Sequence, residues 1–385
     1  MKGELYGLTN PQKSILLTEE FYKGSNINNI CGTAIVEDVL NFDLLKKAIN
    51  VVIKNNDSFN LKLIIDNNEI KQYLSDTCDV SIDVVELACK DDVAKLENEL
   101  MSHIFDIYNG DLFCFKIFKF PDNTGGFMLN IHHLFADSWT LGFVSKEIVR
   151  TYSSLLKGED ILKDEECSYI KYIYNEKEYL YSDKFKKDKE YWEGVFNTIP
   201  EQATIPSSKE ETANNFSCKA NRKVFNIDKV KMDKINEFCK ANSLSVFNFF
   251  MAVYAIYISR VSGIDDFVLG TPILNRTNFK EKHTSGMFIN TAPFRVLVNN
   301  NLDFKSFVAN IAKDSLGMLR HQKYYYQNIL EDLRKRDSSL PNLYNILISY
   351  QVTKANTENG LTYNTRWAFN GNTADDIDIH LSDLN

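Results

Sequence analysis

The stretch from Asn130 to Thr140, NIHHLFADSWT, constrains the fold of this chain more than any other, because it links an apolar strand to an amphipathic helix. The residues FMLNI before the histidines are typical of a short buried strand. After Asp137, apolar residues recur at helical spacing as far as Gly158, which predicts a helix that ends at this glycine. Neighbouring residues of a strand point to opposite faces. We therefore expect His132 and His133 to differ, one packed inside and one facing a cavity.

Two interpretations of this pattern follow from the residues alone. Asp137 and Ser138 are both good helix caps, so in the structural interpretation Asp137 caps the helix and the histidines are ordinary core or surface residues. In the functional interpretation, a rigid scaffold displays a reactive side chain at the end of a strand.

Composition narrows the class of protein. A chain of 385 residues exceeds the size at which one core keeps growing, so two domains or lobes are expected. The net charge of −8 disfavours nucleic acid as a partner. The 7 cysteines lack CxxC spacing, which indicates reduced thiols and predicts no metal site. The longest charge-free apolar run, Leu244 to Ser259, is too short to span a membrane. We expect a cytoplasmic monomer that binds no membrane.

Coarse periodicity predicts a mixed α/β chain. Helices are expected at 42–56, 138–157, 175–196, 228–242, 244–261 and 304–319, and strands at 59–65, 112–120, 127–131, 222–227, 266–272 and 344–351. The stretch 198–217 has little periodicity and is the best candidate for a linker. We therefore divide the chain into a first lobe at 1–175, a connecting helix and linker at 176–217, and a second lobe at 218–385.

Several segments occur in the same order as in one known family. The stretch HHLFADSW resembles the HHxxxDG motif of condensation domains in nonribosomal peptide synthetases, which belong to the HxxxD acyltransferases. The other matching segments are LTNPQKSILLTEEFY (8–22), IKNNDSFNLKL (53–63), VLGTPILNRTN (268–278), SGMFINTAPFR (285–295), RHQKYYYQNIL (320–330) and SLPNLYNILISYQ (339–351). The resemblance covers essentially the whole chain.

The resemblance implies two lobes of the chloramphenicol acetyltransferase type, arranged as a V with a tunnel between them. Within the family, the chain looks most like the starter domains of lipopeptide synthetases. Such domains join a fatty acyl group from acyl-CoA to an amino acid that a carrier protein holds on its phosphopantetheine arm. The implied partners are that carrier protein and an adenylation domain, and no permanently bound cofactor is implied. Family members also continue beyond the last residue of this sequence.

The resemblance also assigns roles to the motif residues. His133 would be the catalytic residue that faces the tunnel. An imidazole that titrates near pH 6.5 suits proton transfer from an amine, so the ring would act either as a base or mainly as a group that positions the substrates. His132 would be structural. Asp137 would hold the loop through an arginine, for which Arg276 is the candidate.

The chain departs from the family pattern in two places. Ser138 replaces the usual glycine after the aspartate, which narrows the space beside a backbone N–H that could serve an oxyanion. Asn56 and Asn60 stand where the family has histidine and arginine. A partner of Asp137 is therefore missing from this segment, and Arg276 or Lys62 would have to replace it.

The residues after 280 leave their roles open. Asn290 and Arg295, in the latch-like segment, either line the tunnel or satisfy backbone groups at a strand edge. His321 and Gln322 are equally open, whereas His283 is expected on a surface loop.

Three alternatives to a starter domain use the same fold. An elongating condensation domain would use the same histidine with a peptidyl donor. A free-standing HxxxD acyltransferase would act on a small alcohol or amine. An inactive recruitment module would typically lack the second histidine, which this chain keeps as His133.

Overall fold

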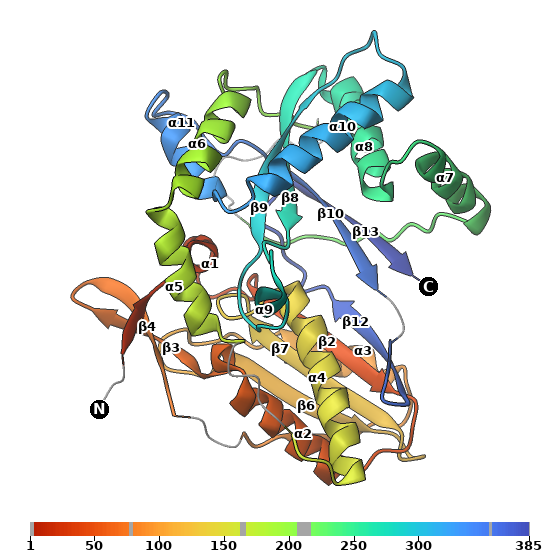
Figure 1. The fold of residues 1–385 in the computed structure, drawn as a ribbon. Helices are drawn as coiled ribbons and strands as arrows, with labels where there is room; N and C mark the ends of the chain where they lie inside the picture. The colour runs from red at the N-terminus through yellow and green to blue at the C-terminus, as the bar shows by residue number, and fades with distance from the viewer. Residues whose placement is uncertain (1–3, 77–79, 162–166, 206–216, 354–355, 385) are drawn as a thin grey trace.

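The computed structural model describes residues 4–76, 80–161, 167–205, 217–353 and 356–384. The chain forms two lobes, each built on its own β-sheet with helices packed against it (Figure 1). The expected linker lies partly outside the described residues, since 206–216 are not among them.

A six-stranded sheet, in the order β11-β12-β2-β7-β6-β5, forms the centre of the first lobe. All neighbouring strands run antiparallel except β5 and β6, which are parallel. Every residue of β7 is buried, because β7 lies between β2 and β6 and is covered on both faces. The strands are β2 (Asn29–Val36), β5 (Asp83–Glu86), β6 (Phe113–Lys119), β7 (Gly125–His132), β11 (Asn356–Glu358) and β12 (Leu361–Ala368).

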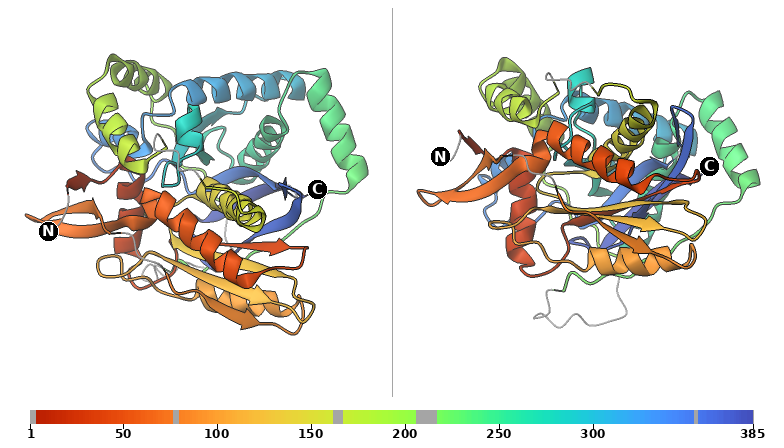
Figure 2. Two further views of the ribbon diagram at one scale, coloured as in Figure 1. Left: turned by 60° about the horizontal axis from the view of Figure 1, so that its bottom comes forward. Right: turned by 90° about the horizontal axis from the view of Figure 1, so that it is seen from below.

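Helices cover both faces of this sheet. α2 (Phe42–Asn55) and α4 (Ser138–Lys157) pack side by side on one face, and α3 (Asp92–Met101) lies on the other (Figure 2). A smaller antiparallel sheet, in the order β1-β4-β3, adjoins α1 (Asn10–Phe21). Its strands are β1 (Leu5–Gly7), β3 (Leu61–Asp66) and β4 (Glu69–Leu74), and a 3-10 turn (Asp57–Asn60) precedes β3.

The second lobe contains a four-stranded sheet in the order β13-β10-β8-β9. Its strands are β8 (Asp266–Ile273), β9 (Asn290–Leu297), β10 (Ile346–Thr353) and β13 (Ile377–Leu384). The helices of this part of the chain are α5 (Tyr169–Leu180), α6 (Asp183–Val195), α7 (Lys229–Ala241), α8 (Val246–Ser262), α9 (Phe279–Lys282), α10 (Phe304–Arg320) and α11 (Tyr326–Arg334). α8 and α10 pack together over the sheet (Figure 1).

Two local predictions from the sequence were wrong. The expected helix at 175–196 is two helices, α5 and α6, because the Ser182 side chain caps a new helix by accepting from the backbone N–H of Phe185. The expected strand at 222–227 is absent, since these residues do not pair with any described strand, and Phe225 is 85% exposed.

The division into lobes also differs from a simple split of the sequence. β11 and β12 come late in the chain, yet β12 pairs with β2 in the sheet of the first lobe. The chain then returns to the second lobe as β13. The expected second lobe, 218–385, thus contributes a strand pair to the first.

One further observation concerns helix length. Within the described ranges, no single helix is both long and apolar enough to cross a bilayer, and only the bent pair α7 and α8 passes a test of length and composition.

Candidate functional site

The histidine motif lies where β7 ends and α4 begins. The backbone N–H of His132 donates to the carbonyl of Leu112, and that of His133 donates to the carbonyl of Asn28, each at 2.8 Å. These bonds continue the strand pairing past the last residue of β7. The turn that carries His133 therefore follows the end of a strand that lies between two others in the sheet, and hydrogen bonds fix its backbone.

The ring of His133 has a defined tautomer. Its Nδ1 lies 2.9 Å from the carbonyl oxygen of Ala136. A carbonyl oxygen can only accept, so Nδ1 carries the proton and Nε2 has a free lone pair. Burial lowers the pKa of His133 to about 4, although the Asp137 carboxylate and the Ala136 carbonyl oppose this shift. At neutral pH the ring is uncharged, and Nε2 is available to accept a proton.

His132 points the other way and is buried. Its Nδ1 accepts a hydrogen bond from the backbone N–H of Leu134 at 3.1 Å, so the ring proton is on Nε2. Nε2 donates to the Glu19 carboxylate of α1 at 3.1 Å. Both ring nitrogens form hydrogen bonds inside the protein, so His132 has a structural role.

Asp137 is the N-cap of α4 and is fully buried. Its carboxylate accepts from the backbone N–H groups of Thr140 and Phe288. Burial alone would raise the pKa of Asp137, but the Arg276 guanidinium and these hydrogen bonds hold it below its usual range. Asp137 is therefore ionised and fixed, and its place is to hold the turn.

Arg276 forms the predicted ion pair with Asp137. The two side chains make a two-point contact, with N–O distances of 2.5 and 3.1 Å. The guanidinium also donates to the carbonyls of Glu281 and Gly286 and lies 4.0 Å over the ring of Phe288. Because Arg276 follows β8, this buried pair fastens the second lobe to the first.

The other departures from the family pattern have local partners. Lys62 pairs with Asp111 and donates to the carbonyl of Gly110, so it does not replace the missing partner of Asp137. Asn60 donates to the carbonyls of Ile53 and Asn56, which closes the end of α2. Ser138 is the first residue of α4 and is half-buried.

The candidate latch residues lie at separate places. Asn290 donates to the carbonyl of Gln322 at 3.0 Å. Arg295 pairs with Asp266 and donates to the carbonyls of Val195 and Thr198, at the end of α6. Arg295 also lines a cavity of about 350 Å³ beside α6, β9 and α10. Within the described ranges, neither residue hydrogen bonds to His133.

Two further histidines, His321 and His283, stack on tyrosine or phenylalanine rings. His321 Nδ1 lies 2.6 Å from the buried carboxylate of Asp188, and its ring stacks on Tyr191. His283 ends α9, where it stacks on Phe279 and is exposed, as expected for a loop residue. Gln322 donates to the carbonyl of Leu319.

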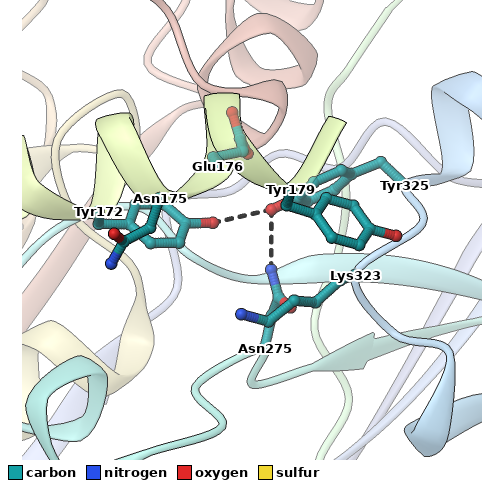
Figure 3. Close-up of a pocket in the computed structure, with 7 residues that line it drawn as sticks. All are labelled: Tyr172, Asn175, Glu176, Tyr179, Asn275, Lys323 and Tyr325. Carbon is teal, nitrogen blue, oxygen red and sulfur yellow. Dashed lines mark hydrogen bonds between the residues drawn. The ribbon is translucent and has the colours of Figure 1, made fainter. Parts of the chain in front are cut away.

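A small polar cavity lies between α5 and the residues Asn275, Lys323 and Tyr325 (Figure 3). The hydroxyl of Tyr325 lies 2.7 Å from that of Tyr172 and accepts from the Asn275 side chain at 2.9 Å. Burial raises the pKa of Glu176, which also lines the cavity, to about 7. The volume of about 10 Å³ is close to the smallest that can hold one water molecule. Neither cavity described here includes His133.

Several residues that contact the histidine motif were not predicted from the sequence. Thr140 bonds both Asp137 and the carbonyl of Gly286 through its hydroxyl. Glu19 and Gln12 lie on the buried face of α1 and contact residues 132–134. The sequence signal that could have identified Glu19 and Gln12 is a polar residue on the otherwise apolar face of α1.

The parts of the chain that the structure describes contain no cluster of three or more His, Cys, Asp or Glu side chains that could hold a metal ion.

The fold and this site together define a class of protein. A neutral histidine with one free ring nitrogen, beside an aspartate held by an arginine, provides a proton acceptor on a rigid turn between two α/β lobes. This is the arrangement that the HxxxD acyltransferase motif implies.

Comparison with known proteins gives the family. The condensation domain family model matches residues 2–382, and the chain therefore belongs to the condensation domains. Condensation domains of nonribosomal peptide synthetases form amide bonds, which is an acyl transfer.

The similar proteins include the synthases of surfactin and plipastatin. The chain is 33% identical over its whole length to surfactin synthase subunit 1 of Bacillus subtilis, and 26% identical to a plipastatin synthase of the same organism. It spans only 11% and 15% of the lengths of these relatives.

Solved structures share the fold. A mutant of the starter condensation domain of rhizomide synthetase RzmA, in complex with C8-CoA, matches with a TM-score of 0.83 at 20% identity, over 98% of this chain and 86% of that one. The first condensation domain of the calcium-dependent antibiotic synthetase, in complex with a substrate analogue, also gives 0.83, at 15% identity, over 99% of this chain and 88% of that one.

Proposed function

We propose that this chain is a starter condensation domain of a lipopeptide synthetase. It joins a fatty acyl group from acyl-CoA to the amine of an aminoacyl thioester on a carrier protein. The observation that carries the proposal is the ring of His133, which is neutral and has its Nε2 lone pair free at the end of a buried strand. The 33% identity to surfactin synthase subunit 1 supports the lipopeptide context. The starter domain of rhizomide synthetase, solved with C8-CoA, supports acyl-CoA as the donor.

The reaction requires one proton acceptor. The amine nitrogen of the aminoacyl group attacks the carbonyl carbon of the acyl-CoA thioester, and a tetrahedral intermediate with a negatively charged oxygen forms. His133 Nε2 takes the proton that the nitrogen must lose, the carbon–sulfur bond breaks, and the proton passes to the leaving thiolate. The backbone N–H of Ser138, at the positive end of α4, is suited to the developing oxyanion. Such a positioned proton transfer contributes about 10²–10⁴-fold to the rate.

The substrates would meet in a tunnel between the lobes. Acyl-CoA would enter from one side and the phosphopantetheine arm of the carrier protein from the other. An adenylation domain of the same assembly line would load the amino acid. Asp137 and Arg276 would keep the lobes in the relative position that this tunnel needs.

Amide formation by this chain tests the proposal. The chain is mixed with C8-CoA and an aminoacyl carrier protein, and the acylated product is measured by mass spectrometry. His133→Ala should lower the rate by about 10²–10⁴-fold. His283→Ala is the matched control, because it removes an exposed histidine and should leave the rate unchanged.

The donor decides between the hypotheses. Transfer from C8-CoA that depends on His133 establishes a starter domain. Transfer only from a peptidyl carrier protein makes the chain an elongating domain and contradicts the proposal. Transfer to a small free amine or alcohol but not to the carrier makes it a free-standing acyltransferase. A folded chain that gives no product with any donor is a recruitment module.

A further inference from the structure

Helix α1 carries two buried polar residues that face the histidine motif. Gln12 and Glu19 lie two helical turns apart, on the same side as the buried Leu16. Gln12 is fully buried and Glu19 is 9% exposed. Burying a carboxylate is costly unless it is hydrogen-bonded. The partners of these two side chains therefore indicate what the helix holds in place.

Glu19 accepts two hydrogen bonds through one oxygen, Oε2. His132 Nε2 donates to it at 3.1 Å and the Asn28 side chain donates at 2.8 Å. On the opposite side of the ring, His132 Nδ1 must accept from the backbone N–H of Leu134. A proton on Nδ1 would face that N–H, donor against donor. Glu19 thus selects the tautomer that allows His132 to hold the backbone of Leu134.

The same helix also contacts the backbone of the motif. The Gln12 amide donates to the carbonyl of Leu134 at 3.1 Å, so both backbone groups of Leu134 are engaged. Asn28 binds Glu19 through its side chain and His133 through its carbonyl. The backbone N–H of His133 thus bonds to Asn28, and the next residue, Leu134, bonds to Gln12 and His132. The positions of both neighbours of His133 therefore depend on α1.

We propose that Glu19 is a positioning residue for His133: through His132 and Asn28 it fixes the backbone on both sides of the catalytic ring. The assignment rests on the proposed function, in which His133 Nε2 must face the attacking amine. Although burial would raise the pKa of Glu19, the hydrogen bonds from His132 and Asn28 hold it below its usual range, so the carboxylate is ionised. Misplacing a reacting group by 1 Å costs about 10²-fold in rate.

Three variants separate positioning from folding. Glu19→Ala removes the acceptor, and we expect kcat for amide formation to fall by about 10²-fold with little change in KM. Glu19→Gln keeps an oxygen that can accept both hydrogen bonds, so it should retain most of the activity. Glu20→Ala removes the same charge from the neighbouring, exposed position of α1 and is the matched control.

The tautomer provides a readout that does not depend on the reaction. In protein labelled with ¹⁵N-histidine, NMR should show the His132 proton on Nε2 in the wild type and in Glu19→Gln, and a mixture of tautomers in Glu19→Ala. A His132 proton on Nδ1 in the wild type overturns the proposal. So does an unchanged kcat in a Glu19→Ala variant that has lost this tautomer. If the wild type forms no amide with any donor, the proposed function fails, while the tautomers still test the role of Glu19 in holding the turn.

Discussion

At the scale of single residues, the chemistry of the site depends on keeping His133 neutral. An ordinary histidine titrates near pH 6.5, but burial lowers the pKa of His133 to about 4. We therefore expect the ring resonances of His133, followed by NMR, to stay in the neutral position down to pH 5. A titration step near pH 6.5 would show that the half-buried ring keeps its ordinary pKa in the folded chain and would contradict this prediction.

The same shift has a consequence for stability. Below pH 6.5 the unfolded chain binds a proton at His133 that the folded chain does not bind until about pH 4. The free energy of unfolding should therefore decrease as the pH falls through this window. His133→Gln removes the group, so its urea midpoint should fall less than that of the wild type between pH 6.5 and 5.

At the scale of elements, the segment 275–289 between β8 and β9 connects the second lobe to the first through hydrogen bonds to Asp137 and Thr140. Gly286 illustrates how tightly it fits. Its φ of +148° suits glycine, and a Cβ there would lie 2.1 Å from the ring of Tyr169. Tyr169 cannot give way, because it is fully buried and its hydroxyl donates to the carbonyl of Met287.

Gly286→Ala should therefore destabilise the chain. We expect the free energy of unfolding, measured with urea, to fall by about 2–3 kcal/mol from overpacking and backbone strain. Gly142→Ala is the control, since Gly142 is exposed within α4 and nothing lies within 4 Å of the added carbon. That substitution should raise stability by about 0.5–1 kcal/mol. Equal effects of the two substitutions would show that the segment is loosely packed.

Elements with a strong local pattern were predictable from the sequence. Helices α4 and α10 have regular apolar spacing, α8 is a continuous apolar run, and all three end near the expected residues. The break between α5 and α6 was not predictable, because it depends on one serine cap and no glycine or proline lies near the break. The pairing of β12 with β2 was missed because partners more than 300 residues apart leave no local signal.

The site follows the same rule. The motif places His132, His133 and Asp137 by itself, since their directions follow from a strand end and a helix cap. The pairing of Arg276 with Asp137 was expected only through the family resemblance, and the geometry of the pair needed the structure. Glu19 and Thr140 look like ordinary helix residues in sequence, and only packing brings them to the motif.

At the scale of the whole molecule, the two lobes are joined more closely than two successive domains. The chain passes from β10 in the second lobe to β12 in the first and returns as β13. The buried pair between Asp137 and Arg276 adds a contact that neither lobe can satisfy alone. Breaking such a pair leaves an uncompensated buried charge, at a cost of about 3–5 kcal/mol. Chains of this size often unfold domain by domain, but these links favour a single unit.

We therefore expect both sheets to lose protection from hydrogen exchange together. Exchange is measured by mass spectrometry in increasing urea for residues 29–36 of β2 and 266–273 of β8. In the wild type the two midpoints should coincide. Asp137→Asn removes the charge that Arg276 needs, so β8 should lose protection at lower urea than β2. Lys62→Met, which breaks an ion pair within the first lobe, should leave the two midpoints together. Separate midpoints in the wild type would mean that the lobes are independent, and that the Asp137–Arg276 pair fixes their relative position without coupling their stability.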